Sequence, residues 1–145
     1  MKKLNIRKRI HDSAVMTPAN SVEAIMPYEK ICNFANEEIG IGRPGFLGIV
    51  VTNGKVSSIS SIRDNENPDF REMNRWFATE VLTNSGDGLI VAQNTKYRLP
   101  TQKQIENTSK LADALAMLGI RLIDNVLVPQ AEDGYFSFVE NEILK

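Results

Sequence analysis

Histidine and cysteine are almost absent from the sequence, with one of each among 145 residues. A zinc centre made of two histidines and an acid therefore cannot be built within one chain. The single cysteine, Cys32, excludes an intramolecular disulfide and fits a reducing compartment, so we expect a cytoplasmic protein. Nothing in the sequence places the single histidine, His11, near Cys32 or a serine, which argues against nucleophilic catalysis with a histidine base.

Long apolar runs and a strong net charge are missing as well. No run approaches the ~20 apolar residues that span a bilayer, so we expect no membrane association. The basic N-terminus lacks a following apolar segment and does not fit a secretory signal. The net charge of −1 carries no overall signature of nucleic-acid binding. The remaining composition, 42% hydrophobic, is that of an ordinary globular domain.

The first half of the chain predicts a helix, a hairpin and a second helix. Residues 27–39 are apolar at helical spacing, with Pro27 as the first helical residue and Gly40 as the stop. Asn53-Gly54 separates two strand-like runs, and it favours a type I′ turn because that turn needs positive φ at both central residues. Residues 70–81 then predict an amphipathic helix.

The second half predicts a strand–helix–strand unit. Residues 89–92 are apolar without alternation, as in a strand buried on both faces, and we expect a polar loop over residues 93–99. Thr101 and Gln104 form a capping box that begins the next helix. Residues 120–128 predict a further strand.

A last strand is expected over residues 134–139, where Tyr135, Ser137 and Val139 alternate with two phenylalanines. The predicted fold class is therefore α/β (α+β): a mixed β-sheet with an antiparallel hairpin, flanked by about three helices. We divide the chain into an N-terminal arm or edge strand, residues 1–15, and a single domain, residues 16–145.

The N-terminal arm is basic. Its cations are Lys2, Lys3, Arg7, Lys8 and Arg9. They could contact a nucleic acid or an acidic partner, or they could line a solvated sheet edge whose charges deter aggregation. The edge strand also leaves formation of a homodimer open.

From residue 89 onward the order of elements resembles the second half of RadC-like JAB (MPN) domains. The matching residues are Leu89-Ile90-Val91-Ala92, Pro100-Thr101, Leu118-Gly119-Ile120, Leu122-Ile123-Asp124-Asn125 and Gly134-Tyr135-Phe136-Ser137-Phe138. The hairpin and Arg71-Glu72 fit this family more loosely, and the resemblance covers about residues 16–140. It implies a JAB/MPN-like (cytidine-deaminase-like) architecture, a zinc cofactor, metallopeptidase-like hydrolysis and an association with DNA repair.

The metal site implied by the resemblance uses two histidines and an acid, with water in the open position. Here Gln93 and Thr95 stand in the histidine positions, Lys103 replaces a loop serine, and Glu106 takes the place of the acid. Glutamine and threonine are not competent ligands for a first-row metal. We therefore predict no metal, no cofactor and no catalytic residues. The expected role is that of a binding or scaffolding module, with the vacated pocket filled by side chains and residues 96–98 at its mouth.

Two alternatives remain. The domain could be a metal-dependent hydrolase with a site rebuilt from His11, Cys32 and Glu106, or with ligands from a partner chain. It could instead be a DNA-repair-associated accessory protein that binds nucleic acid. In that case Lys96, Tyr97 and Arg98, ahead of a helix N-terminus, would join the basic arm in receiving phosphates. The partner, whether protein or nucleic acid, is not identified by the sequence.

Overall fold

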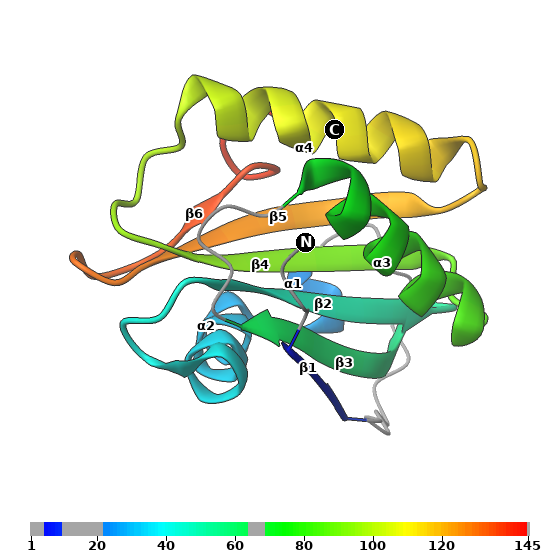
Figure 1. Ribbon diagram of the computed structural model, residues 1–145, viewed down its shortest axis with the longest axis horizontal. Coiled ribbons are helices and arrows are strands. Elements are labelled where there is room, and N and C mark those ends of the chain that lie inside the picture. Colours follow the sequence, from blue (N-terminus) through cyan, green and yellow to red (C-terminus); the bar gives the residue numbers. More distant parts are fainter. Residues whose placement is uncertain (1–4, 10–21, 64–68, 145) are drawn as a thin grey trace.

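A computed structural model describes residues 5–9, 22–63 and 69–144, with the backbone alone for residues 5–9. Within these residues, six strands form one mixed sheet in the order β1-β3-β2-β4-β5-β6 (Figure 1). The strands are β1 (Asn5–Arg9), β2 (Gly45–Thr52), β3 (Lys55–Arg63), β4 (Gly88–Thr95), β5 (Arg121–Pro129) and β6 (Phe136–Ser137). The helices are α1 (Val22–Ile25), α2 (Tyr28–Ala35), α3 (Phe70–Thr83) and α4 (Gln102–Ala116), with a π-helical turn η1 (Asn36–Gly40). The predicted mixed sheet flanked by helices is confirmed.

The β2–β3 hairpin forms as predicted. Asn53 and Gly54 have φ angles of 51° and 78°, the positive values that a type I′ turn requires. A bulge between Val50 and Val51 shifts the register of the two strands. β2 also pairs antiparallel with β4, so the hairpin is joined to the second half of the sheet.

The β4–α4–β5 unit provides the only parallel pairing among the described strands. The predicted capping box is present, because Thr101 accepts from the backbone of Gln104 and the Gln104 side chain accepts from the backbone of Thr101. Past the end of α4, Gly119 adopts a φ of 73°, a left-handed conformation that glycine takes without steric cost. The chain then enters β5 alongside β4.

The sheet separates two apolar layers (Figure 1). One face packs against α1, α2 and η1, around Ile31, Ile39 and Ile90. The other face packs against α3 and α4, around Phe77, Val91 and Leu115. Alternation along each strand sends neighbouring residues to opposite layers. Both layers therefore depend on the same central strands.

Three predicted boundaries differ from the structure. β4 continues to Thr95, so Gln93 and Thr95 are strand residues and not loop residues. They are held because Phe46 of β2 pairs with Gln93 and Pro129 of β5 pairs with Thr95. Polar residues in a strand that is paired on both sides have no local sequence signal, because tertiary pairing overrides intrinsic propensity.

β6 is shorter than the predicted strand 134–139. After Ser137, the backbone N–H of Phe138 still donates to the Asn125 carbonyl of β5. The N–H groups of Asn141 and Ile143 then donate to the carbonyls of Ser137 and Phe138, so the strand ends in a turn. The helix predicted from Pro27 also differs. Pro27 is the N-cap of α2, and the last predicted turn widens into η1.

Several predictions fall outside the described residues. These concern Lys2, Lys3 and His11, and the side chains of Arg7, Lys8 and Arg9. The backbone of residues 5–9 pairs with β3 as the outermost strand of the sheet. α3 begins at Phe70, where Asp69 caps the N–H groups of Arg71 and Glu72. No helix within the described ranges is long and apolar enough to cross a membrane.

Candidate functional site

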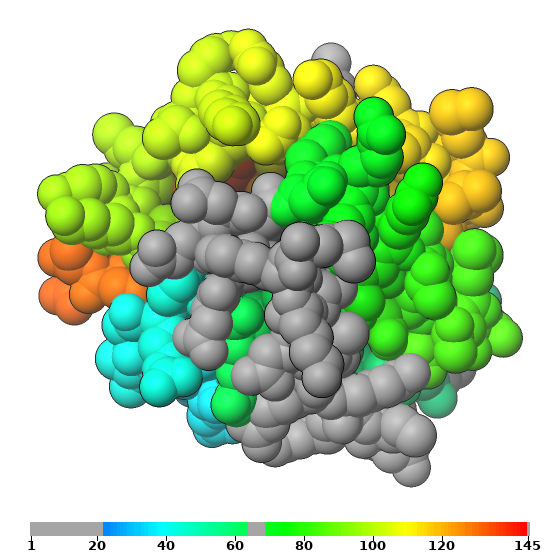
Figure 2. All heavy atoms as spheres, viewed as in Figure 1, coloured from blue at the N-terminus to red at the C-terminus, as the bar shows by residue number. Residues whose placement is uncertain are grey.

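A pocket of about 370 Å³ lies between α3 and α4, over the sheet. Figure 2 shows the atoms of α4 and α3 meeting on this face of the molecule. The described residues that line the pocket are Phe46, Phe70, Met73, Asn74, Phe77, Val91, Gln93, Thr101, Lys103, Gln104, Asn107, Thr108, Leu111 and Asn125. An apolar wall therefore faces a wall of carboxamides and hydroxyls.

Gln93 of β4 lines the pocket because side chains alternate between the two faces of a strand. Leu89 and Val91 belong to the layer under α3 and α4, and Gln93 is the next residue with the same parity. Asn94 points to the opposite face, where its amide donates to the carbonyls of Gly40 and Arg43, each at 3.1 Å. The glutamine therefore stands where the buried part of the strand ends and the pocket begins.

The first turns of α4 form the second wall. The capping box fixes the helix start, and helical periodicity then places Gln104, Thr108 and Leu111 along one side of the pocket. Lys103 and Asn107 line it as well, and Lys103 is exposed to solvent. The sequence interpretation named Lys103 but missed Gln104 and Asn107 as pocket residues, although the spacing from Thr101 could have indicated both.

Asn125 of β5 closes the inner end and was also missed. Its side-chain N–H₂ donates to the Thr108 hydroxyl at 2.8 Å, and that hydroxyl donates to the Gln104 carbonyl at 2.7 Å. The backbone carbonyl oxygen of Gln104 can only accept a hydrogen bond. The Thr108 hydroxyl must therefore donate to it and accept a hydrogen bond from the Asn125 amide. This order fixes the Asn125 amide with its oxygen turned away from Thr108, and that buried oxygen has no partner.

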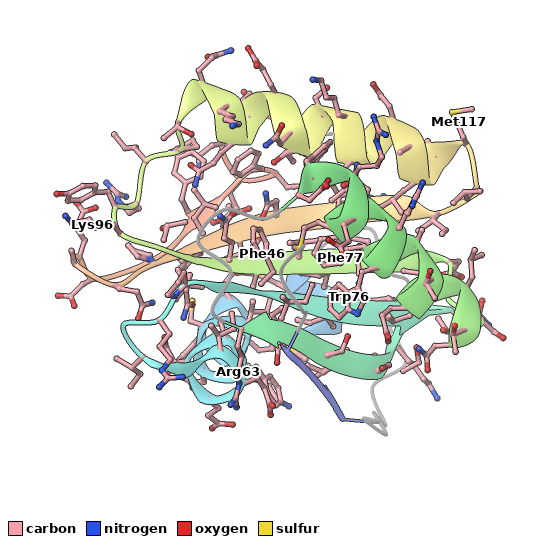
Figure 3. All side chains as sticks on the ribbon, in the orientation of Figure 1. Phe46, Arg63, Trp76, Phe77, Lys96 and Met117 are labelled. Atoms are coloured by element: carbon pink, nitrogen blue, oxygen red, sulfur yellow. The ribbon has the colours of Figure 1, made fainter. Side chains whose placement is uncertain are left out.

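The apolar wall comes from β2 and α3. The rings of Phe46 and Phe77 meet edge to face, with centroids 6.4 Å apart and an angle of 73° between their planes. Figure 3 labels Phe46 beside α3 and Phe77 on that helix. Phe70 and Met73 also line the pocket and extend the same surface. Phe46 and Phe70 remain partly exposed, so this wall is accessible as well as apolar.

The structure brings together some of the predicted site residues and separates others. Gln93 and Lys103 both line the pocket. Thr95 is not among the lining residues, and its hydroxyl donates to the Tyr97 carbonyl at 2.8 Å. Glu106 is exposed on α4, accepts a 3.4 Å hydrogen bond from Gln102, and does not line the pocket either.

The expected mouth at residues 96–98 is wrong, as is the expectation that side chains fill the pocket. The Lys96 carbonyl accepts from the backbone of Ala131, and the backbone N–H of Arg98 donates to Glu132 at 2.6 Å. Lys96 lies over the Tyr97 ring at 5.4 Å. Figure 3 shows Lys96 at the edge of the molecule, away from Phe46 and Phe77. The hydrogen bonds named above join this loop to Ala131 and Glu132, which follow β5, and not to α4.

The donor set of the pocket does not fit zinc. Among the described residues that line it there is no histidine, cysteine, aspartate or glutamate, and the one charged group is the Lys103 ammonium. Zinc requires imidazole, thiolate or carboxylate ligands. Across the described part of the chain, no three such residues lie together in a way that could hold a metal ion. His11 lies outside the described residues, and Cys32 packs in the layer opposite α4.

A second polar cluster lies under α2, around Asp124. One carboxylate oxygen accepts from the Tyr28 hydroxyl at 2.9 Å and the Ser137 hydroxyl at 2.5 Å. The other accepts from the backbone N–H groups of Asn125 and Val139. Burial raises the pKa of the Asp124 carboxyl, while these four hydrogen bonds oppose the rise. The cluster joins α2, β5 and β6 in a completed network, which indicates a structural role.

The model of the RadC-like JAB domain family matches residues 49–143. The match runs from β2 to the turn after β6, so it includes α3, α4 and every described lining residue of the pocket except Phe46. No curated protein matches the chain at a significant level.

Proposed function

Because the chain belongs to the RadC-like JAB domain family, we propose that it is a non-catalytic member that serves as a binding or scaffolding module. The observation that carries this proposal is the chemistry of the pocket between α3 and α4. Among the described residues that line it, the polar side chains are carboxamides, hydroxyls and one ammonium. None of these groups generates a nucleophilic hydroxide from water in the way that a zinc ion does.

Lys103 adds an electrostatic reason. A cation at the pocket wall repels a divalent metal, although salt screens part of this repulsion because Lys103 is exposed. The carboxamides of Gln93, Gln104 and Asn125 offer directional donors and acceptors instead of negative charge. Such groups orient a bound molecule without promoting its hydrolysis.

The alternative of a rebuilt metal centre has little support. It needs Cys32 and Glu106 together, and these residues belong to elements on opposite faces of the sheet. A nucleic-acid role for Lys96 and Arg98 also has no specific observation behind it, since Glu132 lies against that loop and offsets its positive charge. The free thiol of Cys32 supports a cytoplasmic location for the module.

Elemental analysis tests the absence of a metal centre. We expect protein purified without chelator, and also protein incubated with excess zinc and then desalted, to carry far less than one zinc per chain. The reason is the missing ligand set, because structural and catalytic zinc sites use three or four protein ligands. A known zinc hydrolase taken through the same steps serves as the positive control. Retention of about one zinc per chain after desalting would contradict the proposal.

A further inference from the structure

Asn125 lines the pocket, and its side-chain oxygen is a buried hydrogen-bond acceptor with no partner among the described residues. Asn125 is only 6% exposed, so bulk water does not compensate this oxygen. An unpaired buried acceptor is destabilising, and native proteins rarely retain one without a reason. The pocket of about 370 Å³ is far larger than the ~30 Å³ share of one water molecule, so it has room for an organic donor.

The two walls of the pocket define the body of that molecule. Phe46, Phe77 and Met73 present an apolar surface to one side, which suits a flat ring. The carboxamides of Gln93 and Gln104 stand with Asn125 among the polar lining. Carboxamides pair a donor with an acceptor, and this is the pattern with which asparagine and glutamine recognise the edge of a nucleobase. Aromatic rings supply the matching contact to its faces.

The outer end of the pocket favours a negative charge. Thr101, Lys103 and Gln104 line it from the first turn of the 15-residue helix α4. Backbone N–H groups at a helix N-terminus, together with the positive end of the helix dipole, attract anions. Lys103 adds a flexible point charge of the kind that binds phosphate. The pocket thus runs from a buried acceptor to a cationic mouth.

We propose that this pocket binds a mononucleotide, with the base against Phe46 and Phe77 and the phosphate at Lys103. An N–H group of the base donates to the Asn125 oxygen and completes the chain of hydrogen bonds that begins at the Gln104 carbonyl. The inference rests on the proposed non-catalytic function, because the nucleotide is held and not converted. It names the class of ligand that the binding module takes.

Calorimetry with the full chain tests this assignment. The ligands are the four ribonucleoside monophosphates, their nucleosides, ribose 5-phosphate and inorganic phosphate. We expect at least one monophosphate to bind more tightly than its nucleoside and more tightly than either phosphate compound lacking a base. Equal affinity for inorganic phosphate and every monophosphate would overturn base recognition, and no binding by any monophosphate would overturn the inference as a whole.

Two variants locate the site. Lys103→Ala should weaken binding of the preferred monophosphate roughly fivefold, the effect of one solvent-exposed charge contact, and leave the affinity for the nucleoside unchanged. Lys110→Ala is the matched control, since Lys110 is an exposed lysine of the same helix that does not line the pocket. Equal effects from both variants would contradict the assigned phosphate position.

Asn125→Ser removes the unpaired oxygen. Loss of nucleoside and nucleotide binding, together with retained folding by circular dichroism, is the expected result. Unchanged affinity would exclude Asn125 as the base contact. If this buried variant does not fold, Gln93→Ala tests the same polar wall from a partly exposed position.

The same samples distinguish failure of this inference from failure of the proposed function. Zinc content and release of phosphate or base from the nucleotide are measured beside the binding. Turnover of the nucleotide or stoichiometric zinc would overturn the non-catalytic function even if nucleotides bind. Absence of nucleotide binding in metal-free, inactive protein would overturn the ligand assignment alone and leave the module without a named ligand.

Discussion

At the scale of single residues, two adjacent residues of β5 have different roles, one in the stability of the fold and one in the pocket. Asp124 and Asn125 are adjacent in β5, and strand alternation sends their side chains to different faces of the sheet. Asp124 receives four hydrogen bonds and is fully satisfied, whereas Asn125 retains an unpaired oxygen in the pocket. A completed network stabilises the fold, and an incomplete one leaves a position for a ligand.

Asp124→Ala should destabilise the domain strongly. The change leaves the hydroxyls of Tyr28 and Ser137 and two backbone N–H groups buried without their acceptor. We expect a loss of about 3 kcal/mol in the free energy of unfolding, measured by urea titration at pH 7. A loss below about 1 kcal/mol would show that the network contributes little.

Asp124→Asn separates the charge from the hydrogen bonds through the dependence on pH. Burial raises the pKa of the native carboxyl above its ordinary value of 3.8, so the native state holds this proton more tightly than the unfolded state. The resulting stabilisation is complete below pH 3.8 and is lost as the pH rises through the native pKa. Relative to Asp124→Asn, wild-type stability should therefore fall as the pH rises above 3.8. A constant difference between the two proteins would contradict the raised pKa.

At the scale of secondary structure, the start of α4 links stability to the pocket, because Thr101 and Gln104 cap the helix and line the cavity. Thr101→Ala removes the acceptor for the Gln104 N–H and should lower the free energy of unfolding by about 1 kcal/mol, measured by urea titration. Thr79→Ala on the exposed face of α3 is the control, and it should be neutral or slightly stabilising because alanine is the better helix former. Similar losses in both variants would argue against a capping role.

The elements that were predicted correctly carry their signals locally. Asn53-Gly54 determines the hairpin turn, Thr101 with Gln104 determines the start of α4, and apolar spacing determines α3. The extension of β4 to Thr95 depends instead on β2 and β5, which are distant in the sequence. Local patterns therefore located most elements, while pairing partners determined where they end.

The candidate site was predictable only in part. Gln93 and Lys103 were found by comparison with a family pattern, and both line the pocket. Asn125 belonged to the family match but was not predicted to line the site, because an asparagine inside an apolar strand gives no sign of which partners its amide will meet. Glu106 was placed at the site by the same family pattern, but it is exposed to solvent on α4, and Gln104 of that helix lines the pocket instead. The residue types indicated the class of site, and the geometry of α4 determined which of its side chains line the pocket.

At the scale of the whole molecule, one sheet supports two layers, and each layer holds one natural reporter group. Trp76, the single tryptophan, is buried under α3 on the face that also carries the pocket. Cys32, the single cysteine, packs beside the α1 and α2 layer on the opposite face. β2 and β4 contribute residues to both layers, so neither layer can lose its packing without exposing strands on which the other depends.

Unfolding should therefore be a single cooperative transition at both reporters. Trp76 fluorescence and the reaction of Cys32 with a thiol reagent, measured across the same urea series, are expected to have coincident midpoints. In the native state the reaction should be slow, because burial, and to a lesser extent Glu29, raises the pKa of the Cys32 thiol and reduces the thiolate fraction. Cys32→Ser should leave the fluorescence curve in place, as a control for perturbation by the label. Exposure of Cys32 at clearly lower urea than the Trp76 transition would show instead that the α1–α2 layer opens independently of the face that holds the pocket.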